Sequence, residues 1–146
     1  MKQSILFTTT FFLLLCVNLF ATRVNEPLLN KEILQSFKQD FNDAINVSWT
    51  KSGELYKVSF AKDNTSFAAY YTEGGELSVT ARIIFQEQLP FSVLKAIRKS
   101  YTQDEVLSIH EYTNRTEPSY YFIHVSRNNK IQIMKFNSDG WFEILK

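Results

Sequence analysis

The sequence has few residues that form disulfides or that break helices and strands: one cysteine, four glycines and three prolines among 146 residues. So few glycines and prolines exclude collagen-like and low-complexity chains. An excess of charge of one sign is also lacking, because 16 basic residues face 15 acidic ones. That balance excludes a polybasic nucleic-acid binder and an acidic tail protein. Hydrophobic residues make up 45% of the chain, so a packed domain is expected.

The first 21 residues have the pattern of an export signal. Lys2 is the only charged residue of Met1–Ala21, an apolar stretch follows it, and the segment ends on the small residue Ala21. The stretch is short for a membrane span, whereas a signal peptide has this layout. We therefore expect cleavage after Ala21, a periplasmic or secreted protein, and no membrane span in the mature chain.

Two other fates of this segment stay open. Cys16 follows three leucines, which suggests a lipid-anchored form, although the bulky Leu15 stands where a lipidation motif has a small residue. The segment could also remain as an uncleaved anchor. If it is removed, Cys16 is lost with it, so the mature chain would have no disulfide and would depend on its core for stability.

The rest of the chain repeats one pattern. In each half, four apolar residues are spaced to form one stripe on a helix. They are Ile33, Leu34, Phe37 and Phe41 in the first half, and Val93, Leu94, Ile97 and Tyr101 in the second. Asn30 is suited to cap the first helix, and Pro90 is suited to the first turn of the second.

A short apolar segment follows each helix, at 47–49 and at 107–109, and alternating segments typical of strands come next. Turns with paired glycines or Asp-Gly, at 72–75 and 137–140, precede the last strand of each half. The matched strand residues are Tyr56, Val58 and Phe60 with Tyr121, Ile123 and Val125; Ala69 and Tyr71 with Met134 and Phe136; and Leu77 and Val79 with Phe142 and Ile144.

These patterns predict an α+β fold. Each unit is interpreted as helix-strand-strand-strand, and the tandem repeat joins into one antiparallel sheet with both helices packed on one face. We expect a signal peptide at 1–21, a flexible N-terminal lead at 22–30 and a single domain at 31–146, built from repeats 31–86 and 87–146. A chance likeness of two amphipathic α+β stretches is the alternative.

Several of these segments resemble a known family. Phe41–Trp49, Gly53–Phe60 and Ala69–Tyr71, with the second helix opening at Leu89-Pro90, resemble the PepSY-like, β-lactamase-inhibitor-protein-like domains of exported bacterial proteins, a type common in Bacteroidota. The resemblance implies a tandem fold, a periplasmic or secreted location, and a role in binding or inhibiting another protein. It implies no catalytic residue for this chain. The absence of cysteine after residue 21 departs from that inhibitor and argues against inhibition of a β-lactamase in particular.

Few residues are suited to chemistry. His110 and His124 lie in predicted strands outside any nucleophile or metal motif, and a zinc site needs three or four close ligands. Asp104 and Glu105 are sequence neighbours, whereas paired catalytic carboxylates must converge across a bond. We predict no catalytic residue, no metal ligand and no cofactor, so an unrecognised enzyme is only the third hypothesis.

The side of the sheet that the helices leave open is the candidate binding surface. Alternation puts unusually apolar side chains there, and aromatic residues are frequent hot spots of protein interfaces. We predict a noncatalytic exported module that binds an unidentified protein or peptide, as a hydrolase inhibitor or envelope sensor. The alternatives are homodimerisation through the same face, or cover by the chain itself. The candidate residues are Trp141, Tyr120, Phe122, Tyr70, Ile131, Ile133 and Lys135.

Overall fold

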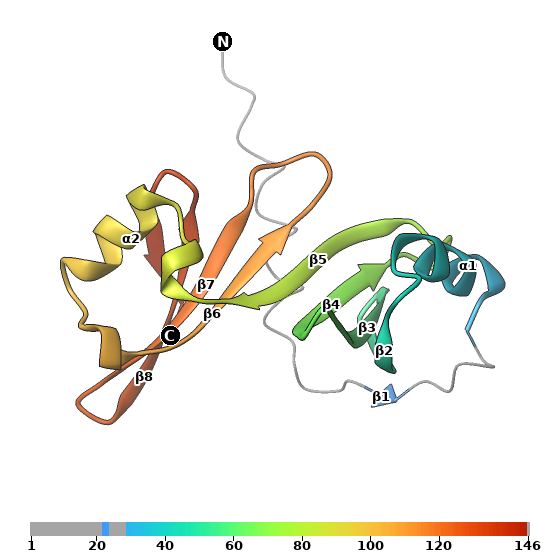
Figure 1. Ribbon diagram of the computed structural model, residues 1–146, viewed down its shortest axis with the longest axis horizontal. Helices are drawn as coiled ribbons and strands as arrows, with labels where there is room; N and C mark the ends of the chain where they lie inside the picture. Colours follow the sequence, from blue (N-terminus) through green and yellow to red (C-terminus); the bar gives the residue numbers. More distant parts are fainter. Residues whose placement is uncertain (1–21, 24–28, 146) are drawn as a thin grey trace, which may run out of the picture.

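A computed structural model describes residues 22–23 and 29–145 of the chain (Figure 1). The expected signal peptide, its cleavage after Ala21 and the lipidation alternative at Cys16 lie outside the described residues. Within them, no helix is long and apolar enough to span a bilayer.

The described strands form one antiparallel sheet whose strand order follows the order of the chain from β1 to β9. Two α-helices, α1 (Lys31–Asp40) and α2 (Phe91–Arg98), and two short 3-10 turns, η3 (Gln86–Gln88) and η4 (Gln103–Glu105), complete the fold. The strands are β1 (Thr22–Arg23), β2 (Ile45–Ser52), β3 (Leu55–Lys62), β4 (Thr65–Tyr71), β5 (Leu77–Ile84), β6 (Val106–Thr113), β7 (Tyr120–Arg127), β8 (Lys130–Asn137) and β9 (Phe142–Ile144).

The predicted α+β class and the tandem arrangement are confirmed. Each helix is followed by four strands, one more than in the interpreted unit, because the segments at 47–49 and 107–109 are parts of the full strands β2 and β6. Thr22–Arg23, within the expected flexible lead, pair with β2 as β1. Leu29 from the same lead is buried against the first half.

Two separate hydrophobic cores lie on one side of this sheet. Ile33 and Phe37 of α1 pack on one half of the sheet, and Val93 and Ile97 of α2 pack on the other. Residues paired across neighbouring strands share a face. Ala69 of the first core pairs with Thr80, so Thr80 faces the helices. Alternation along β5 puts Ile84 on the same face as Thr80, and Ile84 pairs with Ile109 in the second core. Both helices therefore cover the same side, the helix side, and Figure 1 shows each helix over its own half.

Strand β5 joins the two halves. It pairs with β4 on one edge and with β6 on the other, so it is the central strand of the sheet. A β-bulge between Tyr70 and Tyr71 shifts its register, because Tyr70 pairs with Val79 whereas Tyr71 pairs with Leu77. Regular alternation would keep Leu77 and Val79 on one face. The bulge instead turns Val79 to the side opposite the helices.

Equivalent turns hold the two helices. Asn30 caps α1 by accepting a hydrogen bond from the Glu32 N–H, as predicted, whereas Pro90 is the N-cap residue of α2 and lies just before its first turn. In the β4–β5 and β8–β9 turns, Gly75 and Gly140 have positive φ angles of +81° and +88°. Both glycines lie directly against the first turn of a helix, so each half uses the same contact between turn and helix.

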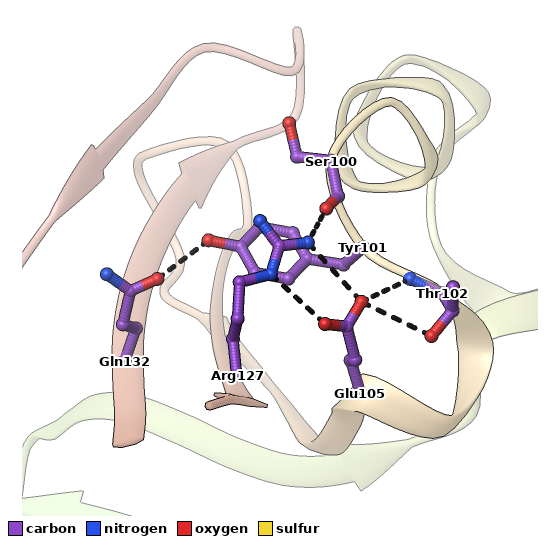
Figure 2. A network of polar contacts seen from close by, with 6 residues as sticks. All are labelled: Ser100, Tyr101, Thr102, Glu105, Arg127 and Gln132. Atoms are coloured by element: carbon purple, nitrogen blue, oxygen red, sulfur yellow. Dashed lines mark hydrogen bonds and ion pairs between the residues drawn. The ribbon is translucent and has the colours of Figure 1, made fainter. Parts of the chain in front are cut away.

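A polar network fixes the end of α2 to the β7–β8 hairpin (Figure 2). Arg127 donates to Glu105 over 3.0 Å and to the Ser100 carbonyl, and its guanidinium lies 4.2 Å from the ring centroid of Tyr101. The Tyr101 hydroxyl donates to Gln132 over 2.8 Å, and Glu105 also accepts from the Thr102 N–H. The network therefore ties η4 and the chain after α2 to two strands.

Glu105 makes this network sensitive to acid. The hydrogen bonds from Arg127 and from the Thr102 backbone lower the pKa of Glu105 to about 2. A carboxylate with a lowered folded-state pKa stabilises the fold above its ordinary pKa, and this contribution is lost as the pH falls towards 2. We expect Glu105→Gln to lower the thermal midpoint at pH 7. The difference in midpoint between the variant and the unaltered protein should shrink as the pH falls towards 2, as measured by circular dichroism. A difference in midpoint that is as large at pH 2 as at pH 7 would show that the charge of Glu105 is not its cause.

Candidate protein-binding face

The side of the sheet opposite the helices, here called the open face, carries a cluster of rings at the junction of the two halves. Tyr112 of β6 stacks on Tyr120 of β7 with ring centroids 5.2 Å apart. Phe122 meets Tyr112 edge to face at 5.1 Å and Tyr120 at 5.8 Å. Such geometries add to the stability of a sheet beyond the area they bury. The strands position these rings by cross-strand pairing of Tyr112 with Tyr120.

A hydrogen bond across β5 brings in Tyr70 from the first half. The side chains of Tyr70 and Tyr112 are hydrogen-bonded to each other, although their strands lie on opposite edges of β5. Val79 and Ala81 of β5 pair with Tyr70 and Tyr112 respectively and are only 8% and 7% exposed. The two tyrosines therefore lean over β5 and cover its small side chains. We call Tyr70, Tyr112, Tyr120 and Phe122 the ring cluster.

The hydroxyls of the ring cluster stay neutral at physiological pH. Burial raises the pKa of Tyr70, and the charge of Tyr112 together with their hydrogen bond raises it further. Burial also raises the pKa of Tyr112 and that of Tyr120, the latter to about 12. Neutral phenols bury at lower cost than charged groups, so these rings are suited to a contact that removes water.

Two lysines lie beside the rings, one in each half. Lys57 Nζ is 5.9 Å from the ring centroid of Tyr70, and Lys135 Nζ is 5.1 Å from that of Tyr120. These distances are within the range of a cation–π contact. Both lysines are half-buried, and their ammonium groups give the cluster a polar border.

His110 and His124 form a second pair of rings on the open face, with centroids 5.5 Å apart. Burial lowers the pKa of His110, and His124 and Lys57 lower it further. His110 is therefore neutral at pH 7 and adds a flat, uncharged surface next to Tyr112. No group of three or more metal-ligating side chains occurs among the described residues.

A hollow of about 470 Å³ opens beside the ring cluster, over strands β2 to β6. Tyr70, Tyr112, His110 and Lys57 line it together with small side chains such as Ala68 and Ser66. The residues around it include no aspartate or glutamate. The open face thus combines rings, a shallow concavity and an absence of acid at the centre of the sheet.

The structure brings together only part of the predicted set. Tyr70, Tyr120 and Phe122 are in the ring cluster, and Lys135 borders it. Ile133 and Ile131 share the open face, because they pair with His124 and Ser126, but they lie further along β8, and Ile131 is 57% exposed.

Trp141 lies away from the ring cluster. It precedes β9, its backbone N–H donates to the side chain of Asn137, and it is 65% exposed. Tyr120 pairs with Asn137, so Trp141 lies two strands from Tyr120, which corresponds to roughly 10 Å. Among the described residues Trp141 makes no ring contact, so it forms a separate exposed position on the edge of the sheet.

Tyr112, His110 and Lys57 are absent from the predicted set. The sequence segment from Ser108 to Tyr112 alternates between Ser, His and Tyr on one side and Ile109 and Glu111 on the other. This alternation could have extended the predicted strand beyond Ile109. Glu111 obscures this strand pattern in the sequence, because a charged residue is unusual at a position that faces the helix side. There it binds Arg82, with 2.6 Å between Oε2 and Nε, and also accepts from Tyr121.

Comparison with known proteins supports the fold. No known family model matches the sequence, and no curated protein matches it. Solved structures from Bacteroides are similar: a candidate periplasmic protein of Bacteroides eggerthii has a TM-score of 0.72 at 16% identity, over 81% of this chain and 86% of its own. A DUF2874 family protein of Bacteroides ovatus has a TM-score of 0.70 at 16% identity, over 81% and 85% respectively.

A BLIP-like protein of Bacteroides fragilis is also similar, with a TM-score of 0.66 at 18% identity, over 79% of this chain and 83% of its own. The family resemblance seen in the sequence is therefore confirmed as a likeness of fold. At these identities the likeness concerns the fold alone.

Proposed function

We propose that this chain is a noncatalytic, exported binding protein that holds another protein or a peptide on its open face. The ring cluster carries this proposal. Four aromatic side chains from both halves lie on the side that neither helix covers. Tyrosine and tryptophan give large contact areas at low entropic cost, and they are enriched at the energetic centres of interfaces.

The fold of the similar structures supports the same proposal. One of them is BLIP-like, and another is a candidate periplasmic protein, which agrees with the export signal proposed for residues 1–21. Within this class, inhibition of a hydrolase or sensing of an envelope protein are the roles we propose.

The proposal predicts that binding and folding respond differently to two substitutions. Trp141→Ala is expected to change the free energy of unfolding by less than about 0.5 kcal/mol, and Tyr120→Ala by about 1 kcal/mol, because Trp141 is exposed and Tyr120 is stacked. In contrast, Tyr120→Ala should weaken partner binding by about 30-fold or more, as expected of a hot spot. Binding is measured with the partner captured from envelope extract, by surface plasmon resonance.

Ile144→Ala is the matched control. Ile144 is 56% exposed, belongs to the same strand edge as Trp141, and faces the helix side through its pairing with Met134. Its substitution should leave partner binding unchanged. Sedimentation of the unaltered protein tests the alternative: a dimer that Tyr120→Ala dissociates would assign the face to self-association. If all three variants bound the partner as tightly as the unaltered protein, the open face would be refuted as the binding surface.

A further inference from the structure

The outward face of α2 carries basic and apolar residues and no acid. Val93 and Ile97 are buried against the sheet. Phe91, Leu94, Lys95, Arg98 and Lys99 occupy positions i, i+3, i+4, i+7 and i+8 and so form one stripe; Leu94 packs partly against the second core at its border, and the other four are exposed. We call these five residues the α2 patch. Lys95, Arg98 and Lys99 are exposed, and residues 91–99 contain no aspartate or glutamate.

Apart from Leu94, which packs partly against the second core, the residues of the α2 patch take no part in the packing of the fold. Lys95, Arg98 and Lys99 form no ion pair with any described residue. Phe91 is 79% exposed, the largest exposed fraction among the large hydrophobic side chains described. A hollow of about 320 Å³ lies between these side chains and is lined by the same five residues. An exposed aromatic ring next to three cations is a combination that suits contact with a surface that is both anionic and apolar.

The corresponding face of α1 differs in charge. Lys31 and Lys38 of α1 are accompanied by Glu32 and Asp40 in the same helix, so its charges balance. Asp40 also pairs with Arg115 at 3.6 Å. The excess of positive charge is therefore a property of α2 and not of both repeats.

The surroundings of α2 leave its cations uncompensated. The turns η3 and η4 that flank α2 carry Glu87, Asp104 and Glu105. Arg127 binds Glu105 (Figure 2), and neither Glu87 nor Asp104 forms an ion pair with a cation of the patch. The same network fixes the chain directly after α2 to the β7–β8 hairpin, so the patch has a defined orientation. Asp139 lies on the turn that packs on Ser92, at the opposite end of the helix from Arg98 and Lys99.

We propose that the α2 patch docks the protein on the surface of an anionic phospholipid bilayer. The three cations would lie against the headgroup phosphates, and Phe91 would enter the boundary between headgroups and acyl chains. Basic side chains and an exposed aromatic residue on one helix face fit such an interface. A bilayer also matches the extended and shallow shape of the patch. The site lies on α2 and is separate from the open face, so this proposal does not depend on the proposed function.

Vesicle binding tests the proposal. The exported form of the chain, purified from the cells and defined by its mass, is sedimented with vesicles of phosphatidylcholine and phosphatidylglycerol in equal parts, and with vesicles of phosphatidylcholine alone. We expect binding to the mixed vesicles only, at low salt. Lys95→Gln with Arg98→Gln should lower the partition coefficient about 25-fold, since each basic residue near such a surface contributes about a factor of five.

Lys31→Gln with Lys38→Gln is the matched control, because it removes the same charge from α1. It should lower the partition coefficient by less than about threefold. Phe91→Ser should weaken binding several-fold and leave its salt dependence unchanged. All of these residues are exposed, so the variants are expected to fold.

Three results would overturn the proposal. An equal loss of binding in the α1 and α2 variants would show a response to net charge alone. Displacement from vesicles by millimolar inorganic phosphate would show that the hollow binds a free anion. The protein could also fail to bind vesicles while the variant with both Lys95→Gln and Arg98→Gln captures less envelope protein. That result would make the patch a protein interface.

Discussion

Phe37→Ala is expected to lower the free energy of unfolding by about 3–5 kcal/mol, the range for truncation of a buried phenylalanine. Phe37 is 6% exposed and contacts four other rings of the first core. Its centroid lies 5.3 Å from those of Trp49 and Phe60, and it also meets Phe41 and Tyr71. Removal of the ring leaves a cavity at the centre of this cluster, because the strand residues around it cannot collapse without losing their register.

Urea denaturation followed by circular dichroism measures the loss. Phe91→Ala is the control, since it removes the same side chain from a site that is 79% exposed, and it should change the free energy by less than about 0.5 kcal/mol. The fluorescence of Trp49 reports on the first core, in which it is 4% exposed. If Phe37→Ala and Phe91→Ala were equally mild, the ring contacts of Phe37 would not support the first core.

Gly140→Ala is expected to cost about 2–5 kcal/mol. Gly140 has a φ angle of +88°, which is unfavourable for any residue with a Cβ atom. A Cβ at this position would lie 2.7 Å from the carbonyl oxygen of Ser92, in the first turn of α2. Backbone atoms cannot move away as a flexible side chain can. The helix must therefore shift from the sheet or the turn must change its conformation.

The first half provides a replicate and a control for this prediction. Gly75→Ala should have a similar effect, because its Cβ would lie 2.8 Å from the Glu32 carbonyl and its φ is +81°. Gly74→Ala should be mild, since the nearest atom would be 3.9 Å away. Thermal midpoints of the three variants separate these cases. Similar midpoints for Gly74→Ala and Gly140→Ala would contradict the close approach of turn and helix.

Helix faces were predictable from the sequence, and so was the fold class. Ile33, Phe37, Val93 and Ile97 are buried as their spacing predicts, because one stripe of a helix must face the core. The repeated turns also predicted where the last strand of each half begins. These are local features, in which the spacing of a few residues decides the structure.

The central part of the candidate site depends on long-range features. The β-bulge at Tyr70 and Tyr71 moves Val79 to the open face, and no signal in the sequence at 77–79 marks it. Tyr112 meets Tyr70 only because β5 pairs with β6 and so joins the two repeats. Alternation within a strand predicts which residues share a face, but it does not predict which strands are neighbours.

The two cores share one sheet and have no buried residue in common. A substitution that loosens one core therefore leaves the packing of the other intact, and the two halves are connected through β5 and the ion pair between Arg115 and Asp40. In evolution each repeat can therefore drift on its own. The joining strand β5 is more constrained, because both halves pair with it. The aromatic side chains beside it can be substituted, and the binding specificity changed, without rebuilding either half.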